Sequence, residues 1–439
     1  MFRKVVKKII PHWLFQAVEP TGHLFEAMMW QVVMGFPAKG LKVIGVTGTN
    51  GKTTVSFMAH TMLNEAGYKV GLMSTVGYGA GSNIHPQVTH MTTSSTRVTL
   101  KRIRELRKEG IEWLVLETTS HALAQNRVWG IPYSVAVMTN LTHEHLAYHR
   151  TFERYREAKV KLFRLAAAGS GLRIGVLNAD DPNAPYFAAV VPNVIRYSIK
   201  QVGADLVASN VKSSASGNEF DVRYQERRLR ITTPLPGSFN VYNSMAACGV
   251  GIAVGLSDKQ IENGIAALKS VEGRMARIEE GQDFSVIVDY AHSPDSFEKL
   301  FTDMKVLSKG RMIVVFGSQG NTGDVSKRAI QGRLAGKHAD LVVITEEDDR
   351  GEDGQAIMEQ IAEGARQSGK VADRDMWLIH NRSDAIAYGI GLARHNDVVM
   401  LLGKGHEKTI EHNAEGEEPW DEPGEARRAL RKLKGKRVA

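Results

Sequence analysis

A glycine-rich segment followed by a lysine and two threonines has the clearest chemical potential. Residues 41–54 read LKVIGVTGTNGKTT, an apolar strand, a tight turn and the start of a helix. Gly48 and Gly51 would let backbone N–H groups converge on an anion, and a helix N-terminus adds a positive field. Lys52 could neutralise the β- and γ-phosphates of a nucleotide, and the Thr53 hydroxyl could ligate Mg²⁺. We therefore predict a nucleotide phosphate site and consider a chance Lys-Thr pair the weaker explanation.

Two later segments end apolar runs with side chains that bind metal ions. Residues 114–128, LVLETTSHALAQNRV, place Glu117 at the end of a strand, where ligands of parallel sheets bind and where a carboxylate suits Mg²⁺. Residues 137–149, VMTNLTHEHLAYH, gather His143, His145 and His149. Without cysteine or an HExxH helix, these histidines are weak support for zinc.

A lysine also lies in a helical pattern further along the chain. In residues 151–163, TFERYREAKVKLF, the side chains of Tyr155, Lys159 and Phe163 recur at helical spacing. The simplest interpretation is an amphipathic helix with a surface lysine.

Two series of alternating strands and helices must position these groups. We expect parallel strands with crossover helices, and an antiparallel excursion over residues 204–233. The first series has strands at Lys42–Val46, Trp113–Glu117, Ser134–Thr139 and Arg173–Leu177, with helices at Lys52–Ala66, Val98–Lys108 and Phe152–Ala168. The second has strands at Ser285–Asp289, Met312–Phe316, Leu341–Thr345, Met376–Ile379 and Val398–Leu402.

These series predict an α/β protein in which a P-loop-type central ATPase domain with a mostly parallel sheet precedes a Rossmann-like, doubly wound C-terminal domain. We place the domains at residues 1–40, a short amphipathic segment, 41–272 and 273–439. The 439 residues exceed what one compact core usually holds, in agreement with several domains.

Composition narrows the class of protein. With 43% hydrophobic and 24% charged residues the chain is neither fibrous nor mostly disordered. The net charge of +8 is mild, and we expect no nucleic-acid partner. Cys248 is the one cysteine, which excludes a disulfide framework and fits a reducing cytoplasm. We predict a cytoplasmic protein, and a monomer.

The first 40 residues allow two interpretations. A basic start is followed by the apolar but interrupted stretch Leu14–Phe36. No run is long enough for a spanning helix or a signal peptide. We favour an amphipathic helix pair that covers the first domain. The alternative is a helix lying weakly on a membrane surface, with basic side chains facing lipid phosphates: Arg3, Lys4, Lys7 and Lys8.

The motifs taken together resemble a known family. TGTNGKTT, a strand ending in Glu, an N-L-T-x-x-H element and a later DYAH, in this order from residue 41 to the end, resemble the Mur ligases, in particular the branch that adds the third residue of the stem peptide. The resemblance implies an ATP-dependent amide ligase of cell-wall (peptidoglycan) precursor synthesis, with an acyl-phosphate intermediate. It implies ATP and Mg²⁺ as cofactors, and a muramyl-peptide-like acceptor and a free amino acid as substrates.

The same resemblance implies the roles of individual residues. For ATP they are Gly48, Thr49, Asn50, Gly51, Lys52, Thr53, Thr54, Asn240, Asn243, Arg274 and Asp289. For Mg²⁺ and catalysis they are Lys52, Thr53, Glu117, His145 and a carbamylated Lys159, while His143 and His149 are expected to be structural or surface residues. For the acceptor they are Thr92, Thr93, Thr119, Gln125 and Arg127, and for the amino acid Arg350, Gly403 and Glu407.

Simpler explanations exist for several of these positions. The threonines could be turn hydroxyls that cap a helix at Arg97, and Asn240 could be a helix N-cap. Carbamylation of Lys159 requires a neutral amine and hence a lowered pKa.

The sequence also departs from the family pattern. Residues 315–328, VFGSQGNTGDVSKR, and 344–353, ITEEDDRGED, lack the usual motifs, with Arg350 retained, so the added amino acid stays open. The 40 residues before the first strand show no βαβ unit for a uridine diphosphate, which leaves a lipid-linked or otherwise altered acceptor as a hypothesis.

Two other functions remain as alternatives. One is a folylpolyglutamate- or cyanophycin-synthetase-like ligase. The other is a non-catalytic nucleotide-binding regulator of the same fold.

Overall fold

The computed structural model describes residues 12–87, 91–200, 203–214, 216–321, 325–413 and 416–438. The chain divides into two compact units. Unit 1 consists of Met1–Val211, Glu219–Thr232 and Tyr242–Leu268, and unit 2 of Lys212–Asn218, Thr233–Val241 and Lys269–Ala439. The longest uninterrupted part of unit 2 thus begins at Lys269.

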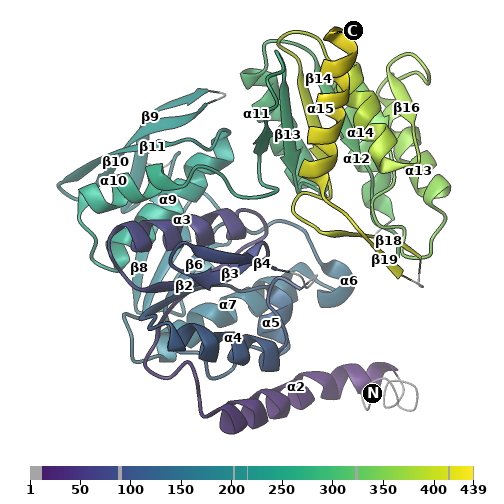
Figure 1. The fold of residues 1–439 in the computed structure, drawn as a ribbon. Coiled ribbons are helices and arrows are strands. Elements are labelled where there is room, and N and C mark those ends of the chain that lie inside the picture. Colours follow the sequence, from purple (N-terminus) through teal and green to yellow (C-terminus); the bar gives the residue numbers. More distant parts are fainter. Residues whose placement is uncertain are drawn as a thin grey trace. The chain divides into compact units, whose positions relative to one another are not determined.

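An eleven-stranded sheet organises unit 1, in the order β11-β10-β9-β8-β7-β6-β1-β5-β2-β3-β4 (Figure 1). Strand β1 lies inside the sheet and pairs in parallel with β5 and β6. The strands are β1 (Lys42–Thr47), β2 (Val70–Met73), β3 (Gly77–Ala80), β4 (Asn83–Pro86), β5 (Trp113–Glu117), β6 (Tyr133–Met138), β7 (Ile174–Asn178), β8 (Asn193–Ser198), β9 (Leu206–Ser214), β10 (Gly217–Tyr224) and β11 (Arg227–Thr233). This confirms the mostly parallel α/β sheet and its four expected parallel strands.

Helices cover this sheet. They are α2 (His12–Met34), α3 (Lys52–Glu65), α4 (Thr96–Lys108), α5 (Ser120–Ala124), α6 (Leu146–His149), α7 (Phe152–Ala168), α8 (Ala184–Ala188), α9 (Ser238–Ala253) and α10 (Asp258–Ala267). Ser257 caps α10, as expected, in a capping box with Gln260.

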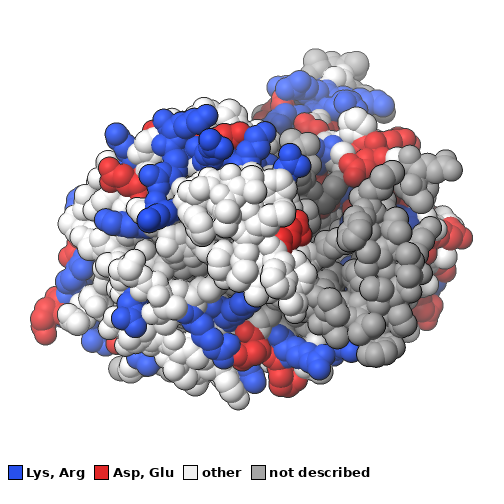
Figure 2. All heavy atoms as spheres, turned by 90° about the horizontal axis from the view of Figure 1, so that it is seen from below, with Lys and Arg blue, Asp and Glu red and all other residues white. Residues whose placement is uncertain are grey.

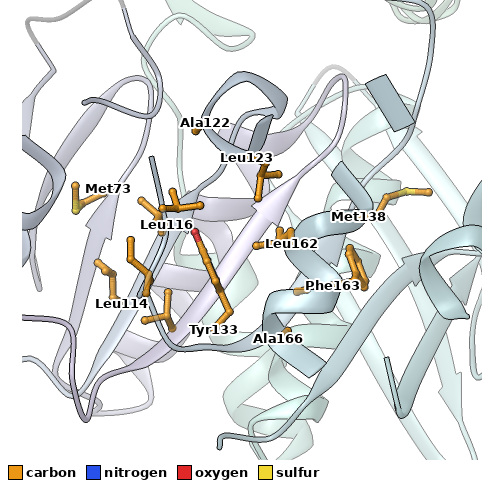
Figure 3. Packing of buried hydrophobic residues seen from close by; sticks show 14 of the residues in the cluster. Met73, Leu114, Leu116, Ala122, Leu123, Tyr133, Met138, Leu162, Phe163 and Ala166 are labelled. Atoms are coloured by element: carbon orange, nitrogen blue, oxygen red, sulfur yellow. The ribbon is translucent and has the colours of Figure 1, made fainter. Parts of the chain in front are cut away.

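The helices that carry the candidate site residues pack into one core cluster. Figure 3 shows Leu114 and Leu116 of β5 with Tyr133 and Met138 of β6 and, from α7, Leu162, Phe163 and Ala166. Gly45 of β1 leaves room for this contact, because a Cβ there would meet the Tyr133 ring at 2.6 Å. The close packing fixes β1, β5, β6 and α7 against one another and so fixes the residues at their ends.

Unit 2 contains a six-stranded sheet in the order β12-β13-β17-β14-β15-β16, parallel except for β12. Its strands are β12 (Ala276–Ile278), β13 (Ser285–Asp289), β14 (Met312–Phe316), β15 (Leu341–Ile344), β16 (Met376–Leu378) and β17 (Val398–Leu402), with a small pair β18 (Thr409–Asn413) and β19 (Gly416–Pro419). The helices are α11 (Pro294–Leu307), α12 (Ser326–His338), α13 (Gly354–Gln367), α14 (Arg382–Gly391) and α15 (Glu422–Val438). The expected doubly wound arrangement is confirmed.

The N-terminal part differs from the expected helix pair. Within the described residues, His12–Met34 is one continuous helix that Pro20 does not break. The four basic residues that we expected to face lipid lie before residue 12, outside the described residues. In the described part of the chain, no helix has both the length and the apolar character needed to cross a membrane.

Candidate active site

The glycine-rich loop joins β1 to α3 and is held from the side by β6. Gly48 and Gly51 have φ angles of +146° and +84°, which L side chains rarely adopt. Thr49 N donates to the Asn140 carbonyl at 2.8 Å, and Asn50 N donates to Asn140 Oδ1 at 2.9 Å. Lys52 Nζ donates to the Thr49 carbonyl at 2.7 Å and therefore lies over its own loop. Loop, lysine and helix start thus have the arrangement that a phosphate site requires, and their role in binding phosphate stays a prediction.

Glu117 lies directly beside this loop. In the parallel register Glu117 pairs with Val46, one residue before the end of β1. Its buried carboxylate accepts from Thr53 Oγ1 at 3.1 Å and from Thr75 N at 2.9 Å. A carboxylate and a hydroxyl next to a phosphate cradle are a fitting donor set for Mg²⁺, which usually takes one or two carboxylates together with substrate phosphates and water.

Lys159 is not on the surface, so the simpler interpretation of α7 is wrong for this residue. Its side chain is 1% exposed, and Nζ donates to the Gly48 carbonyl at 2.6 Å. Burial first, and then the charge of Lys52, lower the pKa of Lys159 well below its usual value. A neutral amine in contact with the phosphate loop is what carbamylation would require.

Aromatic residues place the histidines of the 137–149 segment. His145, with φ +56°, is the N-cap of α6, and its ring centroid lies 6.1 Å from that of Tyr155, whose hydroxyl is 3.0 Å from Thr49 Oγ1. His149 is buried against Ser120 Oγ at 3.0 Å. Burial lowers the pKa of His149 to about 4 and, helped by the charges of neighbouring groups, that of His121 to about 3. Both are therefore neutral at neutral pH.

No metal cluster of three or more His, Cys, Asp or Glu side chains occurs in the described ranges. Zinc chemistry from these histidines therefore has no geometric support in that part of the chain. A site that relies on Glu117, Thr53 and nucleotide phosphates does not need such a cluster.

The threonines expected to hold the acceptor surround Glu117. Thr93 Oγ1 donates to the Glu117 carbonyl at 2.9 Å and accepts from Thr119 N at 3.0 Å. Thr75 Oγ1 donates to Thr92 Oγ1 at 2.9 Å. Helix α4 begins at Thr96 behind Ser95, so the explanation of these threonines as caps of a helix at Arg97 is wrong.

The other two acceptor candidates lie at and just beyond the end of α5. Arg127 Nη1 donates to the backbone carbonyls of Thr93 and Ser94, which ties it to the threonine loop. Gln125 is the C-cap of α5.

Helix α9 carries the two asparagines expected at ATP. Asn243 is buried with its Oδ1 directly against Gly51, where an added Cβ would collide with it. Asn240 Nδ2 donates to the Pro236 carbonyl at 2.7 Å. Because α9 starts at Ser238, Asn240 is not its N-cap, and that explanation is wrong.

In unit 2 the expected residues gather at the carboxyl ends of β13 and β17. Asp289 pairs with Leu402, next to Gly403, and accepts from Met275 N and Ala291 N, each at 2.7 Å. The Arg274 guanidinium lies 4.6 Å from the centroid of the Tyr290 ring. Tyr290 donates to Glu407 Oε1 at 3.1 Å, so Arg274, Asp289 and Glu407 belong to one connected group.

Charged residues continue this group. Lys404 Nζ is fully buried and pairs with Asp348 at 2.8 Å and Glu407 at 2.6 Å. Arg350 pairs with Glu411 and, at 3.5 Å, with Asp348. Glu347 is 2% exposed, and neither of its carboxylate oxygens has a hydrogen-bond partner among the described residues.

Glu347 is also close to Gly403. An added Cβ at Gly403, whose φ is +105°, would collide with the Glu347 carboxylate. Burial raises the pKa of Glu347, while the charge of Lys327 opposes that shift.

Comparison with known proteins agrees with this geometry. The Mur ligase middle domain matches residues 46–251, and the Mur ligase glutamate ligase domain matches residues 273–405. A UDP-N-acetylmuramyl-tripeptide synthetase of Roseiflexus sp. (strain RS-1) is 39% identical over 94% of this chain and 83% of its own. The chain belongs to the Mur ligase family. This Mur ligase is by family an ATP-dependent ligase, and the expected family is confirmed.

Further relatives and structures agree with this assignment. A UDP-N-acetylmuramoyl-L-alanyl-D-glutamate–2,6-diaminopimelate ligase of Geobacillus thermodenitrificans is 38% identical over 89% of the chain described here and 79% of its own chain. The solved structure of a ligase named for the same activity has a TM-score of 0.65 at 29% identity, over 95% of this chain and 83% of its own. A folylpolyglutamate synthase of Mycobacterium tuberculosis has a TM-score of 0.70, over 87% and 92%, but at 16% identity it shows a shared fold alone.

Several residues of these groups were missed from sequence. We did not single out His121, Thr75, Tyr290 or Lys404, although Tyr290 lies within the DYAH motif and His121 within residues 114–128. Strand-end position gives a signal for Thr75, which follows β2, and for Lys404, which follows β17. Strand β2 itself, with four residues, was too short to be noticed.

Proposed function

We propose that this Mur ligase adds an amino acid to the carboxylate of a muramyl-peptide acceptor through an acyl phosphate. The observation that supports this most is the direct contact of Glu117 with Thr53 next to Lys52. It brings a carboxylate, a hydroxyl and an ammonium group to the mouth of a phosphate cradle. The names of the relatives described above agree with this reaction.

Chemistry at the phosphate loop would begin with phosphoryl transfer. A carboxylate oxygen of the acceptor attacks the γ-phosphorus, and the bond to ADP breaks. Backbone N–H groups of the loop and Lys52 balance the charge on the transferred group. Thr53 and Glu117 would hold Mg²⁺, with His145 and carbamylated Lys159 as the further expected contributors, and the ion would supply positive charge next to the transferred phosphoryl group.

The second step forms the amide bond. The neutral amine of the amino acid attacks the acyl carbon, phosphate leaves with the acceptor oxygen, and the nitrogen loses a proton. Thr92, Thr93, Thr119, Gln125 and Arg127 would hold the acceptor near Glu117. Arg127 already ties the threonine loop in place through two carbonyls, which would keep its hydroxyls aligned.

The Lys52→Ala variant tests the first step. We expect it to fold normally and to lose ADP release by at least about 100-fold, because the transferred phosphoryl group loses its nearest cation. Lys69→Ala, in the connection between α3 and β2, is the matched control and should keep full turnover. Retained turnover in Lys52→Ala would refute the assigned role.

We further propose that the amino acid carries a cationic side chain. Lys404 and Arg350 are already shared by Asp348, Glu407 and Glu411, which leaves the buried Glu347 carboxylate without a hydrogen-bond donor. A distal ammonium group would supply that donor. Gly403 and Glu407, next to Glu347, would line the same subsite.

A pooled amino-acid ligation assay read by mass spectrometry tests this specificity. We expect lysine-like diamino acids to be ligated and norleucine, which lacks the ammonium, to be rejected. Glu347→Gln should raise the KM for the diamino acid at least about tenfold, whereas the exposed Glu359→Gln should not. Acyl-phosphate formation without the amine reports the first step, so failure of this specificity is separable from failure of the ligase reaction.

Assays with different acceptors decide between the proposed ligase and the two alternative functions. ATP consumption with muramyl dipeptide, but not with folate or aspartyl acceptors, separates the proposed ligase from the related ones. Phosphate release that needs both acceptor and amino acid excludes a non-catalytic regulator. We propose that the enzyme works in the cytoplasm as a monomer, and a single gel-filtration species of 48.4 kDa would agree.

A further inference from the structure

From Thr21 to Met34, helix α2 buries only one of its two sides. His23, Ala27 and Gln31 face inward, and Gln31 Nε2 donates to the Trp129 carbonyl at 2.8 Å. Trp30 and Met34 pack on the core cluster of unit 1. These contacts fix the orientation of the helix from residue 23 onward.

The outward side of α2 and its C-terminal turn is also apolar. The side chains there recur at helical spacing and are 42–68% exposed: Phe25, Met29, Val32, Val33 and Phe36. We call these five residues the apolar stripe. Glu26 is the single charged residue between Thr21 and Ala38. A helix that is apolar on both sides is normally covered on both.

A basic stripe lies alongside it on α4. Arg97, Lys101, Arg104 and Lys108 recur at helical spacing and are exposed, while Leu100, Ile103 and Leu106 of the same helix are buried. With Arg107 this helix exposes five cationic side chains, against Glu105 and Glu109.

Contacts near both ends of α4 hold this helix against α2 and the segment that follows α2. The Arg97 guanidinium lies 5.0 Å from the centroid of the Trp30 ring, and Arg107 Nη1 donates to the Lys39 carbonyl. Figure 2 views the molecule from the side on which α2 lies in Figure 1, and it shows a broad uncharged surface with groups of Lys and Arg side chains next to it.

We propose that this face docks on an anionic lipid surface. An apolar stripe would enter the boundary between headgroups and acyl chains, and the basic stripe beside it would meet the lipid phosphates. A second copy of this chain is a poorer occupant, because a two-fold interface would bring two basic stripes together. The proposal does not depend on the ligase reaction.

Vesicle co-sedimentation of the full chain tests this docking. Vesicles of about 30% phosphatidylglycerol in phosphatidylcholine should bind the protein at low salt, and pure phosphatidylcholine should bind it far more weakly. The triple variant Phe25→Ser/Val32→Ser/Val33→Ser should lose binding at least about tenfold. Val306→Ser in α11 changes a valine that is 81% exposed, more than the valines of the stripe; it is the control and should bind as the wild type does.

Charge-reversal variants test whether vesicle binding depends on the basic stripe itself or on the net charge of the protein. Lys101→Glu/Arg104→Glu should lose binding at least about tenfold. Lys432→Glu/Lys434→Glu changes the net charge equally on α15 and should lose less than about twofold. Unchanged thermal unfolding shows that each variant is folded.

Three results would overturn the proposal. They are no binding of the wild type to anionic vesicles at low salt, equal losses in both charge-reversal pairs, and unchanged vesicle binding by the triple variant.

Discussion

At the scale of single residues, the central feature is a small set of buried charges around the phosphate loop. Glu117 and Lys159 are both about 1% exposed, and each contacts the loop or the first turn of α3. Buried charges are costly unless they are paired or used. Their placement therefore makes direct predictions for each side chain.

Replacing Glu117 should remove activity but not the fold. Glu117→Gln keeps the shape and an acceptor for Thr75 N but loses the negative charge. We expect kcat to fall about 100-fold and the Mg²⁺ concentration for half-maximal activity to rise. Glu112→Gln, which changes an exposed glutamate directly before the same strand, is the control. Unchanged Mg²⁺ dependence in Glu117→Gln would contradict the assigned role.

Lys159 should make the enzyme respond to bicarbonate. Because burial and Lys52 lower its pKa, more of the amine is neutral near pH 8 than in an ordinary lysine. Removal of dissolved CO₂ should lower activity, and added bicarbonate should restore it. Lys159→Met should lose most activity and this response, while Lys161→Met should keep both. A wild-type enzyme indifferent to bicarbonate would argue against carbamylation.

His60 in α3 should make stability depend on pH. Burial lowers its pKa from 6.5 to about 4, so the folded state binds fewer protons than the unfolded state between these values. Its contribution to the free energy of unfolding is complete above pH 6.5 and decreases as the pH falls towards 4. The full contribution is about 3 kcal/mol. The free energy of unfolding, measured with denaturant at several pH values, should change less with pH between 6.5 and 4 in His60→Leu than in the wild type. An equal pH dependence of the unfolding free energy in the two proteins would show that the histidine is not buried as described.

At the scale of elements, strand ends decide where the chemistry lies. Because β1, β5 and β6 are parallel and in register, Val46, Glu117 and Met138 end at one edge of the sheet. In unit 2 the same rule brings Asp289 beside Leu402 and Gly403. The loop glycines then determine how closely ligands can approach.

A pair of glycine variants separates backbone strain from site geometry. Gly51 and Gly67 have φ angles of +84° and +87°, but an added Cβ collides with Asn243 only at Gly51. Both alanine variants should lose about 1–2 kcal/mol of stability. Gly51→Ala should also weaken ATP binding at least about tenfold, measured by calorimetry, whereas Gly67→Ala should not. Equal ATP affinities would show that the loop tolerates the displacement.

The sequence predicted many of these helices and strands and missed some of the short ones. Long apolar runs identified β1, β5 and β6, because buried parallel strands have few polar residues. The helical spacing of Tyr155, Lys159 and Phe163 identified α7. The hairpin β3–β4 and strand β2 were missed, since four-residue strands carry little periodic signal. The inward orientation of Lys159 was missed because burial of a lysine depends on contacts with Gly48 and Tyr155 that spacing alone does not give.

At the scale of the whole molecule, each unit carries one part of the proposed reaction. Unit 1 has the phosphate loop, Glu117 and the threonines, and unit 2 has the buried acidic subsite around Glu347. The outer face of α2 and α4 would add attachment to a lipid surface. The ligase reaction is the central claim, and it requires that an acceptor carboxylate be phosphorylated before the amide bond forms.

Oxygen transfer measures this step most directly. An acceptor whose terminal carboxylate is labelled with ¹⁸O is incubated with ATP, Mg²⁺ and the amino acid, and the released phosphate is analysed by mass spectrometry. We predict that one ¹⁸O atom passes from the acceptor to each phosphate, and that Lys52→Ala abolishes the transfer. Release of unlabelled phosphate during amide formation would contradict the account.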